Sequence, residues 1–299
     1  MPADPTELFE HHRPALINLA YGMLGRVAPA EDAVQEAYLR WQKQDAGKIQ
    51  SPEAYLTTIV SRICLDELKS AKNRKQEYIG PDLPEPVITT NIGTPESKYE
   101  KQESVSIALL VVLEELTPIQ RAVFLLHDVF DYEFATIAGI LNKSSSYCRK
   151  TAQRARERVR DKEPHYGRKP SGSEELVSTF LQAVENQEPE EIKRYLADEA
   201  VLYSDGGGKV TAARKPVTGA HHIAKFLVGI RNTPVARTSD WTAKPAQVNN
   251  GPGMIVRLKG RIYSVWAFQV DEGQIRQIYA VLNPDKLRHL EQEQSSFRK

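Results

Sequence analysis

The sequence predicts a multidomain chain in which an all-α half is followed by an α+β half. Segments with helical periodicity fill residues 5–75 and 104–160. Two stretches rich in proline, glycine and small polar residues, 79–97 and 163–173, interrupt the pattern and are typical of linkers. After the second stretch, two helical segments precede a series of short β-rich runs, which predicts an α+β domain with an antiparallel sheet.

Length and composition limit the classes of protein that fit. The 299 residues suffice for two or three domains, and 40% hydrophobic and 26% charged residues are ordinary for globular protein. The N-terminus is polar and no apolar run is long enough to span a bilayer, so we expect neither a secretory leader nor a membrane anchor. Cys64 and Cys148 lie far apart in helical patterns, which argues against a disulfide framework and predicts a cytoplasmic protein.

Charge is unevenly distributed, although the net charge is only +1. Residues 76–116 hold 2 basic and 8 acidic side chains, whereas residues 117–169 hold 11 basic and 6 acidic ones. An acidic connector followed by a basic module indicates a local surface for a polyanion.

The helix predicted at 28–41 has two distinct faces. One face carries apolar and aromatic side chains, while the other carries Asp32, Gln35, Glu36 and Leu39. A leucine flanked by acids and an amide on an outward face indicates a surface for a partner protein. Taken alone, the segment also fits an ordinary amphipathic helix.

The helix predicted at 51–75 begins with a serine cap followed by proline. We expect its buried face to contain Leu56, Ile59, Val60 and Ile63. Its polar face contains Thr58, Arg62, Asp66, Lys69 and Asn73. This face fits either a nucleic-acid strand or bulk solvent.

Residues 117–160 predict a helix-turn-helix. Thr117 and Gln120 form a capping box around Pro118, and the helix should run to about Phe130. We expect Asp131 to cap a short second helix, and Asn142-Lys143 to form the turn before Ser144 caps a third.

The third helix carries a narrow stripe of Cys148, Ala152, Ala155 and Val159, which should pack inward. Its N-terminal half holds the polar and basic candidates for contact with DNA: Ser145, Ser146, Tyr147, Arg149, Lys150, Gln153 and Arg154. The competing interpretation is a solvated basic surface helix.

Three motifs in this order, "AEDAVQEAYLRW", "SPEAYLTTIVSRICLDELKS" and "LTPIQRAVFLLHDVFDYEFATIAGILNKSSSYCRKTAQRARERV", resemble a bacterial RNA polymerase sigma factor of the extracytoplasmic-function type. The resemblance covers roughly the first 165 residues. It implies sigma region 2 at 1–78, a linker at 79–103 and region 4 at 104–165. It also implies two partners, promoter DNA and core RNA polymerase, the latter contacted at the clamp of β′ and the flap of β.

The resemblance further implies a role for each candidate surface. The clamp would bind Asp32, Gln35, Glu36, Leu39 and Arg40. The polar face of 58–75, with the preceding loop 42–50, would recognise and open the −10 element. The helix at 145–158 would read the −35 element, and the linker would thread the RNA-exit region.

Residues 171–290 resemble the SnoaL-like branch of the NTF2-like α+β cone fold, which a minority of these sigma factors carry as an extension. "DLPEP" at 82–86, "NPDKL" at 283–287 and the loop 202–219 carry the match, although Asp82 stands where the group usually has an aromatic residue. The extension is expected to act as a built-in regulator. The implied regulatory residues are Leu83, Pro84, Glu85, Pro86, Asp205, Asn283, Pro284, Asp285, Lys286 and Leu287.

An enzymatic extension is the competing hypothesis, since cone folds often enclose a pocket. Its candidates are Tyr203, Asp205, His221, His222 and Trp266. The Asp-Gly-Gly-Gly run also fits a turn, and we find no nucleophile–base pair, no metal-ligand spacing and no implied cofactor. A further hypothesis is that the C-terminal domain has a pocket that binds an unknown small-molecule ligand.

The sequence therefore predicts a sigma factor that initiates transcription at specific promoters, regulated by its fused C-terminal domain and without catalysis of its own. The alternative is a helix-turn-helix transcription regulator with a ligand-sensing NTF2-like domain that does not replace the sigma subunit. The outward face of 28–41 argues against that alternative, because such a regulator does not need it.

Overall fold

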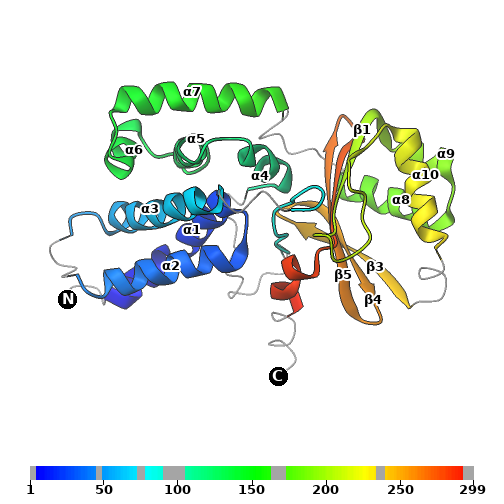
Figure 1. Ribbon diagram of the computed structural model, residues 1–299, viewed down its shortest axis with the longest axis horizontal. Coiled ribbons are helices and arrows are strands. Elements are labelled where there is room, and N and C mark those ends of the chain that lie inside the picture. The colour runs from blue at the N-terminus through cyan, green and yellow to red at the C-terminus, as the bar shows by residue number, and fades with distance from the viewer. Residues whose placement is uncertain are drawn as a thin grey trace. The chain divides into compact units, whose positions relative to one another are not determined.

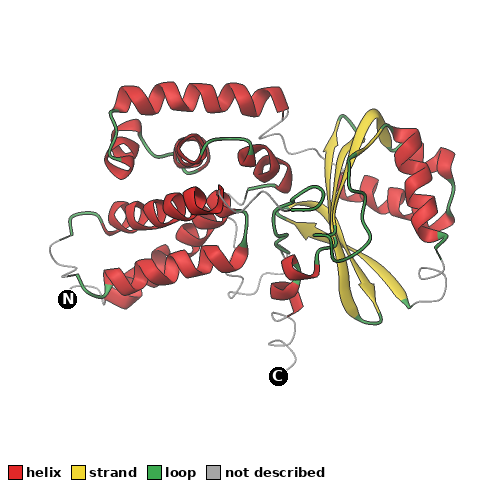
Figure 2. Cartoon of the chain, viewed as in Figure 1, coloured by secondary structure: helices red, strands yellow, loops and turns green. Residues whose placement is uncertain are grey.

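The computed structural model describes residues 5–44, 49–72, 78–89, 105–162, 173–233 and 240–291. The chain forms two compact units. The first contains the N-terminal helices and the helix-turn-helix, and the second contains the C-terminal domain together with the segment 78–89 (Figure 1). Helices dominate the first unit, whereas strands and helices are combined in the second (Figure 2).

The N-terminal part of the first unit is a bundle of α1 (Pro5–Leu24), α2 (Val27–Trp41) and α3 (Pro52–Lys72). Phe9, Trp41 and Leu56 are among its buried side chains. The indole nitrogen of Trp41 donates a hydrogen bond to the carbonyl of Pro5 at 2.8 Å, so this large side chain is buried without an unsatisfied donor.

The rest of the first unit consists of most of α4 (Ile107–Glu114), which belongs to this unit from Leu109 on, and of α5 (Pro118–Phe124), a π-helical turn (Leu125–Val129), α6 (Phe134–Leu141) and α7 (Ser145–Lys162). The capping box of Thr117 and Gln120 is confirmed. Ser144 also caps α7 as predicted, since its hydroxyl accepts from the backbone N–H of Tyr147 at 3.2 Å. Asn142 adopts the left-handed conformation that ends α6.

Two local predictions for this unit are wrong. Asp131 does not cap α6; it has a positive φ of 55°, and Glu133 occupies the cap position. The expected buried face of α3 is rotated, because Thr57 and Ser61 are buried while Ile59 and Ile63 are half-buried. The rotation has a physical reason: α3 packs on one side against α1 and α2 and on another side against α5 and α6.

The C-terminal domain contains the helices α8 (Ser173–Asn186), α9 (Pro189–Arg194) and α10 (Ala220–Arg231). Its strands are β1 (Leu196–Asp205), β2 (Val217–Thr218), β3 (Trp241–Val248), β4 (Gly251–Leu258), β5 (Arg261–Asp271) and β6 (Gln274–Val281), followed by a 3₁₀ turn, η4 (Pro284–Lys286).

The six strands form one sheet in the order β2-β1-β6-β5-β4-β3. The predicted antiparallel sheet is wrong in one respect, because β1 and β6 pair in parallel. Such a pair needs a long crossover, and the chain between β1 and β6 supplies α10 and the meander β3–β5. Pro245 is tolerated within β3 because β3 is an edge strand.

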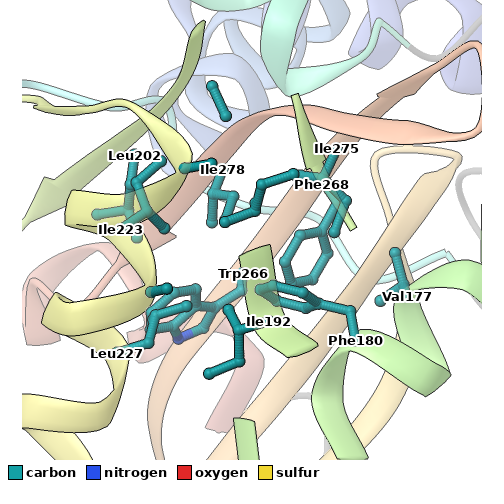
Figure 3. Close-up of a cluster of buried hydrophobic side chains, with 14 of the residues drawn as sticks. Val177, Phe180, Ile192, Leu202, Ile223, Leu227, Trp266, Phe268, Ile275 and Ile278 are labelled. Atoms are coloured by element: carbon teal, nitrogen blue, oxygen red, sulfur yellow. The ribbon is translucent and has the colours of Figure 1, made fainter. Parts of the chain in front are cut away.

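Helices α8, α9 and α10 lie against one face of the curved sheet, which is the NTF2-like cone arrangement (Figure 1). Apolar side chains fill the space between the layers (Figure 3). Phe180 of α8 and Phe268 of β5 meet edge to face, with ring centres 5.8 Å apart. Trp266 and Leu227 are also buried in this cluster.

Candidate nucleic-acid interface and docked linker

The outward face of α2 carries the residues expected to bind the polymerase. Asp32, Gln35, Glu36, Leu39 and Arg40 are all exposed. Leu39 is 49% exposed, so an accessible apolar side chain lies among these charged and polar ones. Arg40 and Glu36 form an ion pair one helical turn apart, and such an exposed pair contributes little to stability. Within the described part of the chain, these exposed side chains therefore contribute little to the packing of the bundle.

On α3, the candidates for contact with the −10 element differ in their environment. Arg62, Asp66 and Lys69 are exposed, whereas Thr58 is half-buried and donates its hydroxyl proton to the carbonyl of Ala54 at 2.6 Å. Lys69 pairs with Asp66 at 2.9 Å. Asn73 and part of the loop 42–50 lie outside the described residues.

The inward stripe predicted for α7 is confirmed, since Cys148, Ala152, Ala155 and Val159 are buried. The side chains expected to contact the −35 element fall outside that stripe. Ser146, Tyr147, Arg149, Lys150, Gln153 and Arg154 are exposed, and Ser145 is half-buried.

The basic side chains of α7 divide into two groups along the helix. Toward the C-terminal end, Arg156 pairs with Asp128 at 2.6 Å, and Glu115 accepts Arg158 at 3.7 Å and Lys162 at 3.5 Å. None of the ion pairs among the described residues involves the N-terminal group, Arg149, Lys150 and Arg154. Arg149 instead lies over the ring of Phe134, with its guanidinium carbon 5.7 Å from the ring centre. The positive charge of the N-terminal half is thus not neutralised by an ion pair within the described part of the chain.

Two polar side chains in the helix-turn-helix contact the N-terminal bundle, and no local pattern in the sequence indicates either contact. The first is Arg121 of α5, which is only 5% exposed. Its guanidinium group donates to the carbonyls of Leu113 at 2.8 Å and Met23 at 2.6 Å. These carbonyls lie in the last turns of α4 and α1, where backbone acceptors lack helical partners. Burial lowers the pKa of Arg121 below its ordinary value.

The second is Tyr132, in the connection before α6. Its hydroxyl donates to a carboxylate oxygen of Glu53 at 2.8 Å and lies 3.0 Å from the hydroxyl of Thr57. Because the single phenol proton goes to Glu53, Thr57 is the donor in the second bond. Burial raises the pKa of Tyr132 to about 12. A third contact also joins the helix-turn-helix to α3, since Arg62 of α3 donates to the carbonyl of Ile140 in α6 at 3.2 Å.

In the second unit, the segment 78–89 lies on the C-terminal domain as an extended strand-like chain. Thr89 donates its N–H to the carbonyl of Gln247 at 3.0 Å. Val87 and Asn249 exchange two bonds, from Val87 N–H to the Asn249 side chain at 3.1 Å and from Asn249 N–H to the Val87 carbonyl at 2.8 Å. His289 lies 2.8 Å from the carbonyl of Pro86. We call this segment the docked linker.

Asp205, at the end of β1, connects the docked linker to the domain. This side chain is fully buried, and one carboxylate oxygen accepts from the hydroxyl of Tyr78 at 2.6 Å and the N–H of Gly207 at 3.0 Å. The other oxygen accepts from the N–H of Leu83 at 3.0 Å and the ammonium group of Lys286 at 2.7 Å. Burial and the bond to Asp205 raise the pKa of Tyr78 to about 12.

Lys286 completes the same cluster. Its ammonium group also bonds to the carboxylate of Asp82 and the carbonyl of Leu83. Burial alone would lower the pKa of Lys286, but Asp82 and Asp205 together raise it above its ordinary value, so the group stays charged at neutral pH. Asp82, which stands where the group of similar proteins usually has an aromatic residue, therefore supplies a negative charge that balances the charge of Lys286.

Asn283 links Asp285, another residue of the NPDKL motif, to this cluster. Its amide nitrogen donates to the hydroxyl of Tyr78 at 2.9 Å, and its amide oxygen accepts from the N–H of Asp285 at 3.1 Å. Asp285 pairs with Lys209, which follows Gly206, Gly207 and Gly208 in the loop after β1. We call residues 206–209 the glycine-rich loop. We call Tyr78, Asp82, Asp205, Asn283 and Lys286 the docking cluster. Sequence reasoning missed Tyr78 and Lys209, as well as the partners of the linker backbone, Gln247, Asn249 and His289.

The candidates for catalysis have other environments. Trp266 donates to the hydroxyl of Ser264 at 2.8 Å within the core, and Tyr203 stacks on Tyr279 with ring centres 5.4 Å apart. One ring nitrogen of His222 lies 3.0 Å from the carbonyl of Thr218. No group of three or more potential metal ligands occurs among the described residues. In the described part of the chain, no helix is long and apolar enough to cross a membrane.

Comparison with known proteins identifies the class. Residues 8–74 match the family model for sigma-70 region 2, and residues 106–159 match the model for sigma-70 region 4. The chain is thus a sigma-70-type transcription initiation subunit with an additional C-terminal domain.

Full-length relatives narrow the class to one family. The chain is 34% identical to the extracytoplasmic-function (ECF) RNA polymerase sigma factor SigJ of Mycobacterium tuberculosis, over 93% of this chain and 91% of that protein. It is 27% identical to the probable ECF sigma factor SigI of the same species, over 94% of each chain. The crystal structure of SigJ matches with a TM-score of 0.77 and 31% identity, covering 95% of this chain and 98% of that one. The chain therefore belongs to the extracytoplasmic-function family of RNA polymerase sigma factors, and its activity is promoter-specific initiation of transcription.

Proposed function

We propose that different surfaces of regions 2 and 4 bind the polymerase and the two promoter elements during initiation. The face of α2 around Leu39 binds the β′ clamp of core RNA polymerase, and region 4 lies at the β flap. The polar face of α3 holds the −10 element, while the N-terminal half of α7 reads the −35 element in the major groove. The observation that supports this assignment is that Arg149, Lys150 and Arg154 are exposed and form no ion pair with another described residue, whereas Arg156, Arg158 and Lys162 on the same helix are paired.

The chemistry of promoter opening fits two separate modules. Opening DNA requires unstacked bases held by protein, at a cost of about a few kcal/mol per flipped base. Binding at −35 makes binding at −10 effectively intramolecular, which helps to offset that cost. The connector between α3 and α4 must therefore be long enough to allow both contacts.

We also propose that the C-terminal domain regulates initiation through the docked linker. Twelve residues of the connector, 78–89, are held on this domain by the docking cluster and by backbone bonds. Their release would free about 40 Å of extended chain, at about 3.3–3.6 Å per residue. The domain can thereby set how far regions 2 and 4 separate. We infer no catalytic role for it, since Asp205 is buried and occupied by the linker.

The test of the main function is run-off transcription with the purified full-length chain and core RNA polymerase. Selective initiation with core enzyme alone is expected. Activity that needs a holoenzyme already containing another sigma subunit would instead support the helix-turn-helix regulator.

The regulatory role is tested with Asn283→Ala, which removes the bond to Tyr78. Run-off activity should change several-fold at equal protein concentration. Lys225→Ala, on the exposed surface of α10, is the control. Equal activity of Asn283→Ala and wild type would contradict regulation through the docking cluster.

A further inference from the structure

The ring of Phe134, at the start of α6, lies beside one of the basic side chains proposed to read the −35 element. The guanidinium carbon of Arg149 in α7 is 5.7 Å from the centre of this ring, within the range of a cation–π contact. Phe134 is half-buried and Arg149 is exposed, so the contact lies at the surface of the helix-turn-helix. The ring therefore restricts where the guanidinium group of Arg149 lies.

A histidine in turn contacts Phe134. The ring centres of His127 and Phe134 are 4.0 Å apart, and the ring planes are inclined by 37°. His127 belongs to the π-helical turn, and one of its ring nitrogens lies 2.9 Å from the carbonyl of Tyr132. The π-helical turn, α6 and α7 thus each supply one side chain to a series of contacts that ends at Arg149. We call His127, Phe134 and Arg149 the arginine stack.

Stacking and base recognition use different parts of a guanidinium group. An aromatic ring contacts its flat face, whereas the N–H donors that bond to O6 and N7 of guanine point outward in its plane. Arg149 can therefore keep its contact with Phe134 while its N–H groups bond to a base. An ion pair instead occupies these donors, as at Arg156, whose Nε bonds to Asp128 at 2.6 Å.

We propose that Phe134 is a positioning residue for recognition of the −35 element, because it holds the guanidinium group of Arg149 where it can bond to a base. The proposal rests on the function proposed above, which places Arg149 at that element, and it adds a residue that need not touch DNA. A free arginine side chain has many rotamers, and binding a base restricts them at a cost in free energy. Partial restriction before DNA binds reduces that cost.

The size and sign of the effect follow from the populations of the Arg149 side chain. An exposed cation–π contact gives about a two- to five-fold preference for the stacked conformation. Since this is the conformation that reads the base, losing the ring lowers the competent fraction, and with it the apparent affinity, by about the same factor. A ring that held Arg149 away from DNA would have the opposite effect when removed.

The experiment measures binding of promoter DNA by the holoenzyme formed from core RNA polymerase and the full-length chain. The probes are a promoter that the wild type selects in run-off transcription and the same DNA with each −35 base pair replaced in turn. The ratio of the affinities for original and replaced DNA is the discrimination at that base pair. Arg149→Ala first identifies the base pair at which discrimination depends on Arg149.

Phe134→Leu keeps an apolar side chain but removes the ring. It should lose about two- to five-fold of the discrimination at the base pair identified with Arg149→Ala and none at the others. Phe134→Tyr keeps an aromatic face and should discriminate as the wild type does. Phe226→Leu in α10 is the matched control, because it replaces another half-buried phenylalanine but lies in the C-terminal domain.

The double variant Phe134→Leu, Arg149→Ala distinguishes positioning from a structural role. Because Phe134 acts through Arg149, it should discriminate no worse than Arg149→Ala alone. A loss from Phe134→Leu that persists without Arg149, or that is the same for every DNA, would overturn the proposal and make Phe134 a structural residue.

Two other results would also overturn the positioning role. One is equal or stronger discrimination by Phe134→Leu than by wild type, and the other is the same loss in Phe134→Tyr as in Phe134→Leu. If Arg149→Ala changes discrimination at no base pair although the wild type initiates selectively, the proposed function of Arg149 itself fails, and the role of Phe134 fails with it.

Discussion

The ammonium nitrogen of Lys286 lies 2.7 Å from a carboxylate oxygen of Asp205, and both side chains are almost completely shielded from water. The same carboxylate oxygen accepts the backbone N–H of Leu83 in the docked linker. Lys286 also bonds to the carbonyl of Leu83 and to Asp82. The linker thus completes the coordination of a buried charge pair, so its docking and the pairing of Lys286 with Asp205 depend on each other.

Removing the lysine should therefore undock the linker. Lys286→Met leaves the carboxylates of Asp205 and Asp82 without their cation, and a broken buried pair costs about 3–5 kcal/mol. We expect a lower free energy of unfolding of the C-terminal domain in denaturant and faster protease cleavage within 78–89. Lys225→Met, which changes an exposed lysine of α10, controls for the substitution itself.

The double variant Asp205→Asn, Lys286→Met distinguishes the interaction between these two side chains from the separate effect of each substitution on stability. The two changes together should cost less than the sum of the single costs, by about 1–3 kcal/mol, because the double variant removes both charges of the pair. Strict additivity would mean that the two groups do not interact in solution.

Gly207 provides a test of the contact between the glycine-rich loop and the NPDKL motif. It has φ of +57°, and a Cβ at this position would lie 2.2 Å from the side-chain nitrogen of Asn283. Gly207→Ala should thus suffer both backbone strain and a clash. Gly260→Ala is a sharp control, since Gly260 has φ of +80° but open space around its Cβ position.

We expect Gly260→Ala to lose about 1–2 kcal/mol of stability from backbone strain alone. Gly207→Ala should lose clearly more and should also alter run-off activity, because Asn283 must move from its bond with Tyr78. Equal melting temperatures for the two variants would show that the Asn283 side chain moves away from the new Cβ without a loss of stability.

The parts of this structure that the sequence predicted depend on neighbours in the chain. The capping box of Thr117, the cap of Ser144 and the buried stripe of α7 all involve residues within a few positions of one another. Helical and strand periodicity is a local property as well, which is why most elements of both units were located correctly.

The parts that were missed depend on packing between distant segments. Asp205 is 127 residues from Tyr78 and 81 from Lys286, so no local pattern reveals that Lys286, which resembles a solvated tail residue, is buried. The parallel pairing of β1 with β6 is equally long-range. The left-handed conformation of Asp131 accompanies the π-helical turn before it, in which Phe130 bonds five residues back to Leu125.

Recognition of the −35 element should depend on the exposed N-terminal half of α7. Arg149→Ala or Lys150→Ala in the holoenzyme should weaken promoter binding by about 1–3 kcal/mol if the side chain contacts a base, and the loss should depend on the −35 sequence. A contact to phosphate would weaken all sequences alike and reduce the salt dependence. Arg158→Ala is the control, since Arg158 already pairs with Glu115. Comparable losses in all three variants would contradict the division of α7 into two groups.

Binding to the polymerase should depend on the exposed apolar side chain of α2. Leu39→Arg places a charge where we propose an apolar contact with the β′ clamp, and a lost central contact of this kind costs about 2 kcal/mol or more, a fall of roughly 30-fold in affinity. Folding should be unaffected, because Leu39 is 49% exposed. Ile230→Arg is a matched control, as Ile230 is 40% exposed on α10 of the C-terminal domain. Titration of core RNA polymerase with both variants measures the difference in affinity. Equal affinities would show that this face of α2 is not the polymerase-binding surface.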